Sequence, residues 1–426
     1  MSYINFTTKA DNSLTHAFLD DIKIFSEKRY TCGILHKLIK SKKLKCSFYT
    51  STIDNCYLVM IVSYNDRLLM DLGLRYGLPR GYPIIWRPTQ FVRSFGFFPK
   101  SDNDDRQNPF SSADFEGAAK CVFNYKYSGF LGQLITFQVD GQLYWTTVAK
   151  NSSGNKYSDD IKRIITQNTN PELFEKLIQA LDDRKMHLCG ETLSFDDQTH
   201  GSRYKQEAFI VTGIGYGFYY NFVDNIHEGT STYSFVTFME LNTMHEFAKY
   251  YGLQVDNVFV IENTNITAFL DIMASHRNFA TCTSLDAIFK DNADINVFSG
   301  TIQHYDVIGD TLEGFIIRIY KADGLHTVKF KFPKYTSVTF GIREMITKDS
   351  ALWNDHWNNY VDRWVVDDID GKKYWLQFGN LVIDNYDNLM KDISCGNVGK
   401  HICIAEKVSD MLPINIDKKM MEMTVV

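Results

Sequence analysis

Two apolar segments and a short polar stretch between them restrict how this chain can fold. The segments, Val122–Tyr125 and Phe130–Ile135, have the composition of β-strands, and Lys126-Tyr127-Ser128-Gly129 separates them. Burial of the Lys126 ammonium would cost several kcal/mol unless the group is paired or neutral. A buried lysine can also lose its proton near neutral pH and attack phosphorus or carbonyl carbon. Gly129 would let the backbone come close to a ligand. The stretch therefore indicates either a lysine exposed at the end of a strand or a nucleophile.

Length and composition indicate a globular protein with one large or two medium domains. The chain has 426 residues, of which 44% are hydrophobic, as expected for a protein with a substantial core. Its 45 lysines and arginines are outnumbered by 51 aspartates and glutamates. The basic charge over the whole protein that is typical of nucleic-acid binding is therefore absent, although a local basic patch stays possible.

Cysteine spacing and the lengths of the apolar runs predict a soluble intracellular protein. The 8 cysteines are scattered without Cys-x-x-Cys spacing, which disfavours structural zinc and suits reduced thiols inside a cell. A secretion signal has a cationic segment followed by an apolar one, and the chain does not start in this way at Met1–Asn5. No run of about 18 apolar residues could cross a membrane. We therefore expect a cytoplasmic or nuclear protein without a membrane segment.

Apolar periodicity and turn residues predict a mixture of helices and antiparallel strands. Helices are expected over 14–30, from Asn170-Pro171 to about 181, and over 243–251. Strands are expected over 46–51, 57–64, 186–195, 311–320 and 327–332, with a hairpin over 138–150 that turns at Asp140-Gly141. Gly213-Ile214-Gly215-Tyr216-Gly217 matches no nucleotide-binding fingerprint, so it is predicted to be a flexible turn. After Pro333 the pattern becomes helical, which predicts domains of 1–335 and 336–426.

Four further stretches carry residues suited to nucleotides or metal ions. They are Arg80-Gly81, Glu191 with His200 nine residues later, Glu313-Gly314 at the start of an apolar strand, and Lys329-Phe330-Lys331. The two lysines are two residues apart, so they lie on one face of a strand, and such a pair suggests an anionic ligand such as phosphate. Each stretch alone also fits a solvated strand edge or a surface turn. On an exposed face, Glu313, Lys329 and Lys331 would contribute little to stability.

The order and spacing of the stretches resemble the covalent nucleotidyltransferase superfamily, which includes RNA ligases, DNA ligases and mRNA capping enzymes. Lys126-x-x-Gly129 resembles the first motif, which is usually Lys-x-Asp-Gly or Lys-x-Asn-Gly. The third, fourth and fifth motifs are resembled by Glu191 with its flanks, by Glu313-Gly314-Phe315-Ile316-Ile317-Arg318, and by Lys329-Phe330-Lys331.

Within the superfamily, the chain is most similar to the ligase domain of fungal and plant tRNA ligases and to the phage RNA ligase that repairs cleaved tRNA. Their third motif reads like Glu-Leu-x-Asp-Asp-x-Phe-Glu-Glu-His, and Glu191 and His200 keep that separation. The resemblance extends from Arg80 to Arg343-Glu344-Met345-Ile346-Thr347-Lys348. Two positions depart from the pattern. Ser128 replaces Asp or Asn, and Phe340 replaces the first of two arginines that are three residues apart.

The resemblance implies an α+β fold, with an antiparallel-sheet nucleotidyltransferase core and a small helical C-terminal domain. It implies an ATP-dependent RNA ligase of RNA repair or tRNA splicing that forms lysyl-AMP on Lys126, transfers AMP to a 5′-phosphate and seals that end to a 3′-hydroxyl. Lys329 and Lys331 would hold the α-phosphate, Glu191 would contact the ribose, and Glu313 would hold Mg²⁺ through water. The remaining implied contacts are Arg80, Arg93, Gly129 and Lys150 for the nucleotide, and His200 and Arg343 for the RNA end.

The implied cofactors are ATP and Mg²⁺, and the implied partner is RNA with 3′-hydroxyl and 5′-phosphate ends. The sequence has no Gly-x-x-x-x-Gly-Lys-Ser/Thr loop and no paired His-x-Thr motifs. Separate kinase and phosphodiesterase enzymes are therefore expected to prepare the ends. Two alternatives stay open. One is a capping-type guanylyltransferase, which uses the same lysine chemistry with GTP. The other is a non-catalytic RNA-binding relative, which the departure at Ser128 makes conceivable.

Overall fold

The structure is a computed structural model. It describes residues 1–10, 13–26, 30–100, 102–103, 115–196, 205–217, 235–262, 295–301, 313–322 and 324–331, and isolated positions between 355 and 387. The chain forms two compact units. Unit 1 contains residues 1–101, 129–194 and 207–255, and unit 2 contains 102–128, 195–206 and 256–426. The predicted boundary near Tyr335 and the predicted helical C-terminal domain fall outside the continuously described residues and stay predictions. The fold is α+β, with helices and largely antiparallel sheets.

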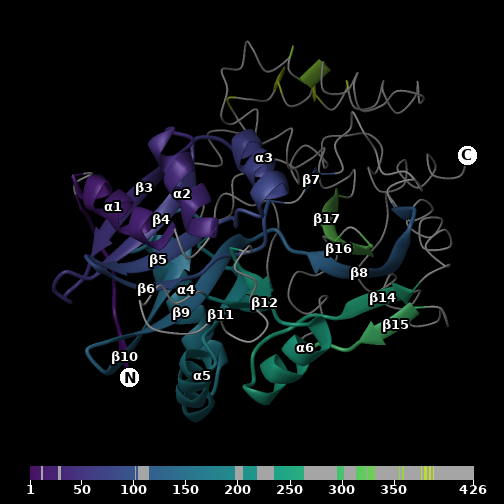
Figure 1. The fold of residues 1–426 in the computed structure, drawn as a ribbon. Helices are drawn as coiled ribbons and strands as arrows, with labels where there is room; N and C mark the ends of the chain where they lie inside the picture. Colours follow the sequence, from purple (N-terminus) through teal and green to yellow (C-terminus); the bar gives the residue numbers. More distant parts are fainter. Residues whose placement is uncertain are drawn as a thin grey trace, which may run out of the picture. The chain divides into compact units, whose positions relative to one another are not determined.

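The larger sheet of unit 1 has the strand order β1-β10-β9-β11-β12-β13 (Figure 1). Its strands are β1 (Ser2–Tyr3), β9 (Phe130–Val139), β10 (Gln142–Ala149), β11 (Met186–Leu193), β12 (Ala208–Tyr216) and β13 (Thr237–Phe238). Asp140 and Gly141, with φ of 51° and 78°, connect β9 to β10. Positive φ at both residues is the conformation that a two-residue hairpin requires. The predicted hairpin and its turn are confirmed.

Three helices pack against this sheet: α4 (Lys156–Asn168), α5 (Pro171–Asp183) and α6 (Leu241–Tyr250). Asn155 caps α4 through a reciprocal pair of hydrogen bonds with Ser158. The side chain of Asn170 accepts from Glu172 N, and Pro171 occupies the first turn of α5. A capping asparagine supplies an acceptor that the first turn lacks, and proline has no amide hydrogen to leave unsatisfied there. The helix start predicted at Asn170-Pro171 is confirmed.

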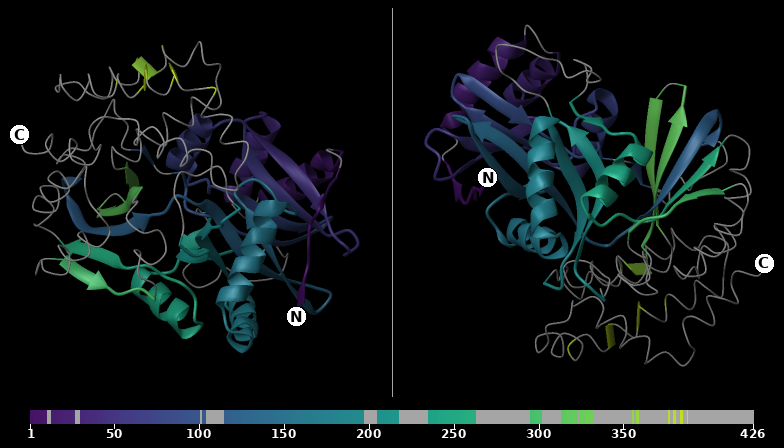
Figure 2. Two further views of the ribbon diagram at one scale, coloured as in Figure 1. Left: turned by 180° about the vertical axis from the view of Figure 1, so that it is seen from behind. Right: turned by 90° about the horizontal axis from the view of Figure 1, so that it is seen from below.

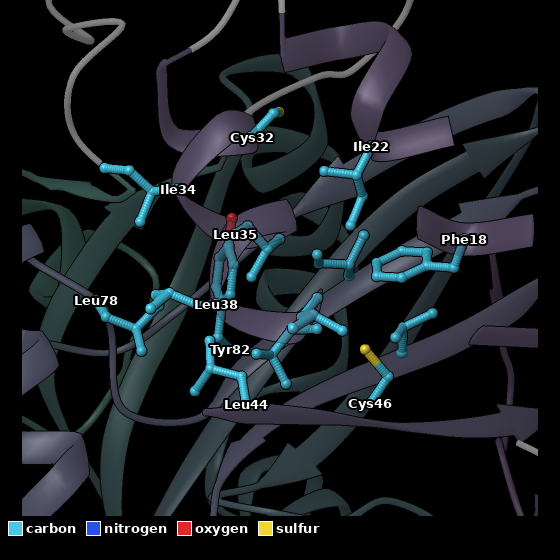
Figure 3. Packing of buried hydrophobic residues seen from close by; sticks show 14 of the residues in the cluster. Phe18, Ile22, Cys32, Ile34, Leu35, Leu38, Leu44, Cys46, Leu78 and Tyr82 are labelled. Atoms are coloured by element: carbon cyan, nitrogen blue, oxygen red, sulfur yellow. The ribbon is translucent and has the colours of Figure 1, made fainter. Parts of the chain in front are cut away.

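The second sheet of unit 1 has the order β2-β3-β4-β5-β6. Its strands are β2 (Thr8–Lys9), β3 (Leu44–Thr50), β4 (Tyr57–Ser63), β5 (Tyr82–Arg87) and β6 (Gln90–Ser94). Val59 and Ile61 join a core cluster with α1 (Leu14–Ser26), α2 (Tyr30–Lys40) and α3 (Asp66–Tyr76), of which part is drawn in Figure 3. Leu58 and Met60 join another cluster with side chains of β9 and β10. Successive side chains thus enter different cores, as the alternation of a strand requires.

The N-terminal helical region differs from the sequence-based prediction of one helix over 14–30. The first helix ends at Ser26, and α2 follows as a separate helix. Ile34, Leu35, Leu38 and Ile39 of α2 are buried, a spacing typical of one helical face. Asp21 of α1 accepts hydrogen bonds from Trp86 Nε1 at 2.8 Å and from the Thr89 amide at 2.9 Å.

The prediction that the glycine cluster forms a flexible turn is wrong, because β12 runs through Gly213 and Gly215. Gly215 pairs with His187 of β11. A Cβ added at Gly215 would lie 2.4 Å from a carbon of the His187 ring, and one at Gly213 would lie 2.8 Å from the Phe98 ring. These glycines therefore make room for two rings against the strand, a use of strand glycines that periodicity alone does not reveal.

Unit 2 contains a sheet with the order β15-β14-β8-β16-β17-β7 (Figure 2). Its strands are β7 (Asp102–Asn103), β8 (Ala118–Lys126), β14 (Val258–Glu262), β15 (Ile295–Phe298), β16 (Gly314–Lys321) and β17 (Gly324–Lys331). Phe123, Phe259 and Phe315 are 0% exposed and lie on one face, which buries that side of the sheet. The strand pair predicted over 311–320 and 327–332 is confirmed as the β16–β17 hairpin. Among the described helices, none is long and apolar enough to span a membrane.

Candidate nucleotide site

Strand pairing in unit 2 brings three of the predicted motifs together. Gly314 of β16 stands opposite Lys126 of β8 on one side and opposite Lys331 of β17 on the other. In the next row of the same face, Ile316 stands between Asn124 and Lys329. Neighbouring strands are about 4.8 Å apart. The lysine stretch, the Glu-Gly stretch and the paired-lysine stretch therefore meet at one end of three adjacent strands.

Lys126 forms an ion pair with Glu313. Its Nζ lies 2.7 Å from Glu313 Oε1, and the two side chains are 17% and 4% exposed. The ammonium also donates to the backbone oxygen of Tyr127 at 3.2 Å. This pairing supplies the partner that a largely buried lysine needs. Ser128, which replaces the Asp or Asn of the resembled motif, is 1% exposed.

Glu313 is the described carboxylate that could hold Mg²⁺ beside Lys126. The described residues contain no group of three metal-ligating side chains. Mg²⁺ commonly keeps several waters and binds through one or two carboxylates together with substrate phosphates. A single buried carboxylate that is paired with a lysine therefore fits a Mg²⁺ ion that binds together with a nucleotide. It does not fit a metal ion that is held by protein side chains alone.

Two further basic side chains lie on the Lys126 face of the sheet. Lys329 is 9% exposed, and Arg318 is 6% exposed. The Arg318 guanidinium donates from Nη1 to Asn124 Oδ1 at 3.0 Å, and burial lowers the pKa of Arg318. Arg318 had no predicted role, although its distance of four residues from Gly314 along a strand puts both on one face. The side chain of Lys331 is not described.

Unit 1 holds the other predicted nucleotide contacts. Arg80 is half-buried, and its guanidinium carbon lies 5.0 Å from the centre of the Phe97 ring. Burial lowers the pKa of Arg80, while the nearby negative charges of Glu191 and Asp66 oppose the shift. Its Nε is buried without a hydrogen-bond partner among the described residues. Arg80 is thus held near carboxylates, with one buried donor that no described residue satisfies.

Gly129 is required by packing within unit 1. A Cβ at this position would lie 2.4 Å from the Thr192 backbone oxygen and 3.1 Å from Glu191 Cγ. Real Cβ atoms do not come that close to a backbone oxygen, so a larger residue would displace β11. The glycine predicted to admit a ligand therefore also admits the neighbouring strand that carries Glu191.

Lys150 belongs to a cluster that the sequence did not reveal. Its Nζ lies 3.2 Å from Asp66 Oδ1, and Nζ of Lys100 lies 3.1 Å from Asp66 Oδ2. Burial raises the pKa of Asp66, but the hydrogen bonds and charges of the two lysines outweigh it and hold that pKa below its usual value. Asp66 and Lys100 carry no periodic or motif signal, because only the fold brings them to Lys150.

Arg93 does not lie where its prediction requires. Its side chain is 0% exposed, and it donates to the backbone oxygens of Thr136 and Met186, each at 2.8 Å. The carboxylate of Asp182, also 0% exposed, lies 3.8 Å away. A guanidinium that binds buried backbone oxygens and lies near a buried carboxylate has a structural role in the protein interior. We therefore exclude Arg93 from the candidate site. His200 and Arg343, predicted to bind the RNA end, lie outside the described residues.

No protein family matches the chain, and no curated protein is similar to it.

Proposed function

We propose that the protein is an ATP-dependent RNA ligase that joins 3′-hydroxyl and 5′-phosphate ends through a lysyl-AMP intermediate on Lys126. The observation that carries the proposal is the pairing of Gly314 with both Lys126 and Lys331 across three strands. Through this register, Lys126, Glu313 and the strand that carries Lys329 and Lys331 meet at one end of the sheet. The same residue types are those that nucleotidyl transfer to lysine needs.

The first step joins the Lys126 nitrogen to the α-phosphorus of ATP. Nζ loses a proton, the new N–P bond forms, and the bond to the leaving pyrophosphate breaks. Glu313, 2.7 Å from Nζ, orients the amine and can accept its proton. Mg²⁺, when bound beside Glu313, would neutralise phosphate charge. Because the reaction is an in-line phosphoryl transfer, positioning and charge stabilisation supply most of the catalysis.

Basic residues of the same face would stabilise the negative charge of the transferring phosphate. Lys329 is 9% exposed and Arg318 is 6% exposed, and charges shielded from water act more strongly on a ligand. AMP then moves to the 5′-phosphate of the RNA, and the 3′-hydroxyl displaces it. For Arg80, Lys150 and Glu191, the contacts to the outer phosphates and to the ribose stay predictions of the resemblance. RNA and separate end-preparing enzymes are the proposed partners.

Covalent labelling tests the proposal directly. The protein is incubated with Mg²⁺ and labelled ATP or labelled GTP, and the product is mapped by mass spectrometry. We expect one AMP on Lys126 and no label in Lys126→Ala. Lys120→Ala is the matched control, because Lys120 lies on the same strand and face and contacts the Tyr320 ring instead. Label from GTP alone would indicate a guanylyltransferase, and no label from either nucleotide would indicate a non-catalytic protein.

A further inference from the structure

Asp66 covers a pair of lysines from the solvent side. Its two carboxylate oxygens lie 3.2 Å from Lys150 Nζ and 3.1 Å from Lys100 Nζ. The Asp66 side chain is 66% exposed, whereas the lysine side chains are 34% and 14% exposed. The carboxylate is thus the outermost member of the group. A ligand that approaches these lysines from solvent reaches Asp66 first.

Arg80 adds a third positive charge to the group. Its guanidinium interacts electrostatically with Asp66 and Glu191, and its buried Nε has no hydrogen-bond partner among the described residues. Three cations thus share two carboxylates in this part of unit 1. The group carries an excess of positive charge, which favours an anion with several oxygens.

We propose that Asp66 is an internal competitor, whose carboxylate the polyphosphate end of a nucleotide displaces from Lys100 and Lys150. A carboxylate and a phosphate edge present paired oxygens to cationic donors in a similar way, but the phosphate carries more charge. A triphosphate can therefore replace Asp66, whereas a ligand with a single phosphate competes poorly. Asp66 thereby sets the selectivity of the site for long polyphosphates. The proposal rests on the proposed function in taking the ligand to be a nucleotide.

Local structure allows the Asp66 carboxylate to leave the lysines without loss of its helix. The capping side chain of α3 is Asn65, whose Oδ1 accepts from the Leu68 amide at 2.8 Å. The other end of α3 is closed by Gly77, with φ of 65°. Asp66 is therefore not the residue that satisfies the first turn. Replacement of Asp66 should leave the helix folded, which a thermal melt of each variant checks.

Binding of inorganic tripolyphosphate to the full chain, measured by calorimetry, tests the proposal. In Asp66→Asn we expect tripolyphosphate to bind about five- to fiftyfold more tightly at low salt, since one repulsive charge is removed near the ligand. The gain should shrink at high salt, and it should be much smaller for orthophosphate. Asp71→Asn is the control, because Asp71 lies on the same helix and pairs with Arg75 at 2.8 Å. It should leave the affinity unchanged.

The sign of the change separates competition from a structural role. If Asp66 merely held the lysines in place, its removal would weaken binding, and unchanged or weaker binding in Asp66→Asn overturns the proposal. Addition of Lys150→Met to Asp66→Asn should remove most of the gain, and a gain that persists in the double variant also overturns it. If Asp66→Asn does not fold, Asp66→Ser is measured in its place.

Lysyl-AMP formation is measured on the same protein samples, so that a failure of this proposal can be distinguished from a failure of the proposed function. Label on Lys126 without a tighter Asp66→Asn complex would sink the role of Asp66 and leave the ligase standing. Tighter tripolyphosphate binding without any label would support the role of Asp66 and count against the ligase.

Discussion

Glu313 and Lys126 form an ion pair of 2.7 Å in which the carboxylate is 4% exposed and the ammonium is 17% exposed. The two residues lie far apart in the sequence, and the pairing of Gly314 with Lys126 brings them together. The sequence predicted that Glu313, like Lys329 and Lys331, lies on an exposed face and has little effect on stability. The burial of Glu313 changes that expectation, because a buried charge that loses its partner is costly.

Glu313→Gln should affect both chemistry and stability. We expect lysyl-AMP formation to fall about a hundredfold or more, and the free energy of unfolding to fall by about 1–3 kcal/mol because Lys126 loses its partner. Labelling rates and urea denaturation measure the two effects. The double variant Glu313→Gln/Lys126→Met should recover part of the stability, since no charge is then left alone. Equal stability of Glu313→Gln and the wild type would contradict the ion pair.

Lys329→Met should reduce lysyl-AMP formation by about a hundred- to a thousandfold, because it removes a shielded positive charge from the Lys126 face. Lys321→Met is the control. Lys321 lies on β16 at the other end of the sheet, opposite Gly324 and Ala118, and its loss should leave the labelling rate within about twofold. A rate in Lys329→Met equal to that of Lys321→Met would remove Lys329 from the site.

His187 should make the protein less stable as pH falls below neutrality. Burial lowers the pKa of His187 to about 3, with the charge of Arg93 acting in the same direction, while its hydrogen bonds to backbone atoms of Gly96 and Gly215 oppose the shift. In the unfolded chain the imidazole has a pKa near 6.5. Between these values the unfolded state binds more protons, so stability is full above about pH 6.5 and declines toward pH 3.

The expected loss is about 2 kcal/mol between pH 6.5 and pH 5, at roughly 1.4 kcal/mol per pH unit. Urea denaturation at several pH values measures it. His187→Gln cannot titrate, so its stability should depend less on pH over this interval, even if the variant is less stable throughout. The same slope in both proteins would show that His187 does not titrate on unfolding.

Gly215→Ala should destabilise unit 1 by about 1–3 kcal/mol, because the added methyl would lie 2.4 Å from the His187 ring and overpack a filled interior. Gly33→Ala is the matched control. Gly33 lies in α2, and its nearest neighbour to an added Cβ is 3.7 Å away. Alanine there should stabilise by about 0.5–1 kcal/mol through its helix propensity. Thermal melts that rank the two variants in the opposite order would contradict the packing around β12.

The requirement for a 2′-phosphate at the 3′-hydroxyl end should be weak. The resembled tRNA ligases demand this phosphate, and their relatives hold it with a histidine and two arginines. His200 and Arg343 match two of these positions, and Phe340 replaces the third. Loss of one arginine–phosphate contact weakens discrimination by roughly ten- to a hundredfold. Ligation rates on RNA with and without the 2′-phosphate measure this.

Phe340→Arg should raise the preference for the phosphorylated end if the resemblance holds at this position. A preference above about a thousandfold in the wild-type protein would contradict the prediction. It would imply that another basic residue, such as Arg203 or Lys334, supplies the missing contact.

Local features of the fold were predictable because their causes act over a few residues. Asn170-Pro171 starts α5 through a side-chain cap and a missing amide hydrogen. Asp140-Gly141 closes the β9–β10 hairpin because its twist requires positive φ. The β16–β17 hairpin was visible as two apolar strands around a turn. In each case the determining interaction lies within the segment itself.

Long-range features required the tertiary structure. The sequence identified Lys126 and Glu313 separately, but only strand pairing made them an ion pair. Arg93 resembled a nucleotide contact and lies in the interior of unit 1. Asp66 and Lys100 had no signal at all, although they meet Lys150. The physical reason is that residue type determines what a side chain can do, whereas burial and partners depend on packing between distant segments. For this protein, the sequence by itself determined the local turns, the caps and the candidate chemistry, and the tertiary structure decided which charges are paired and which are buried.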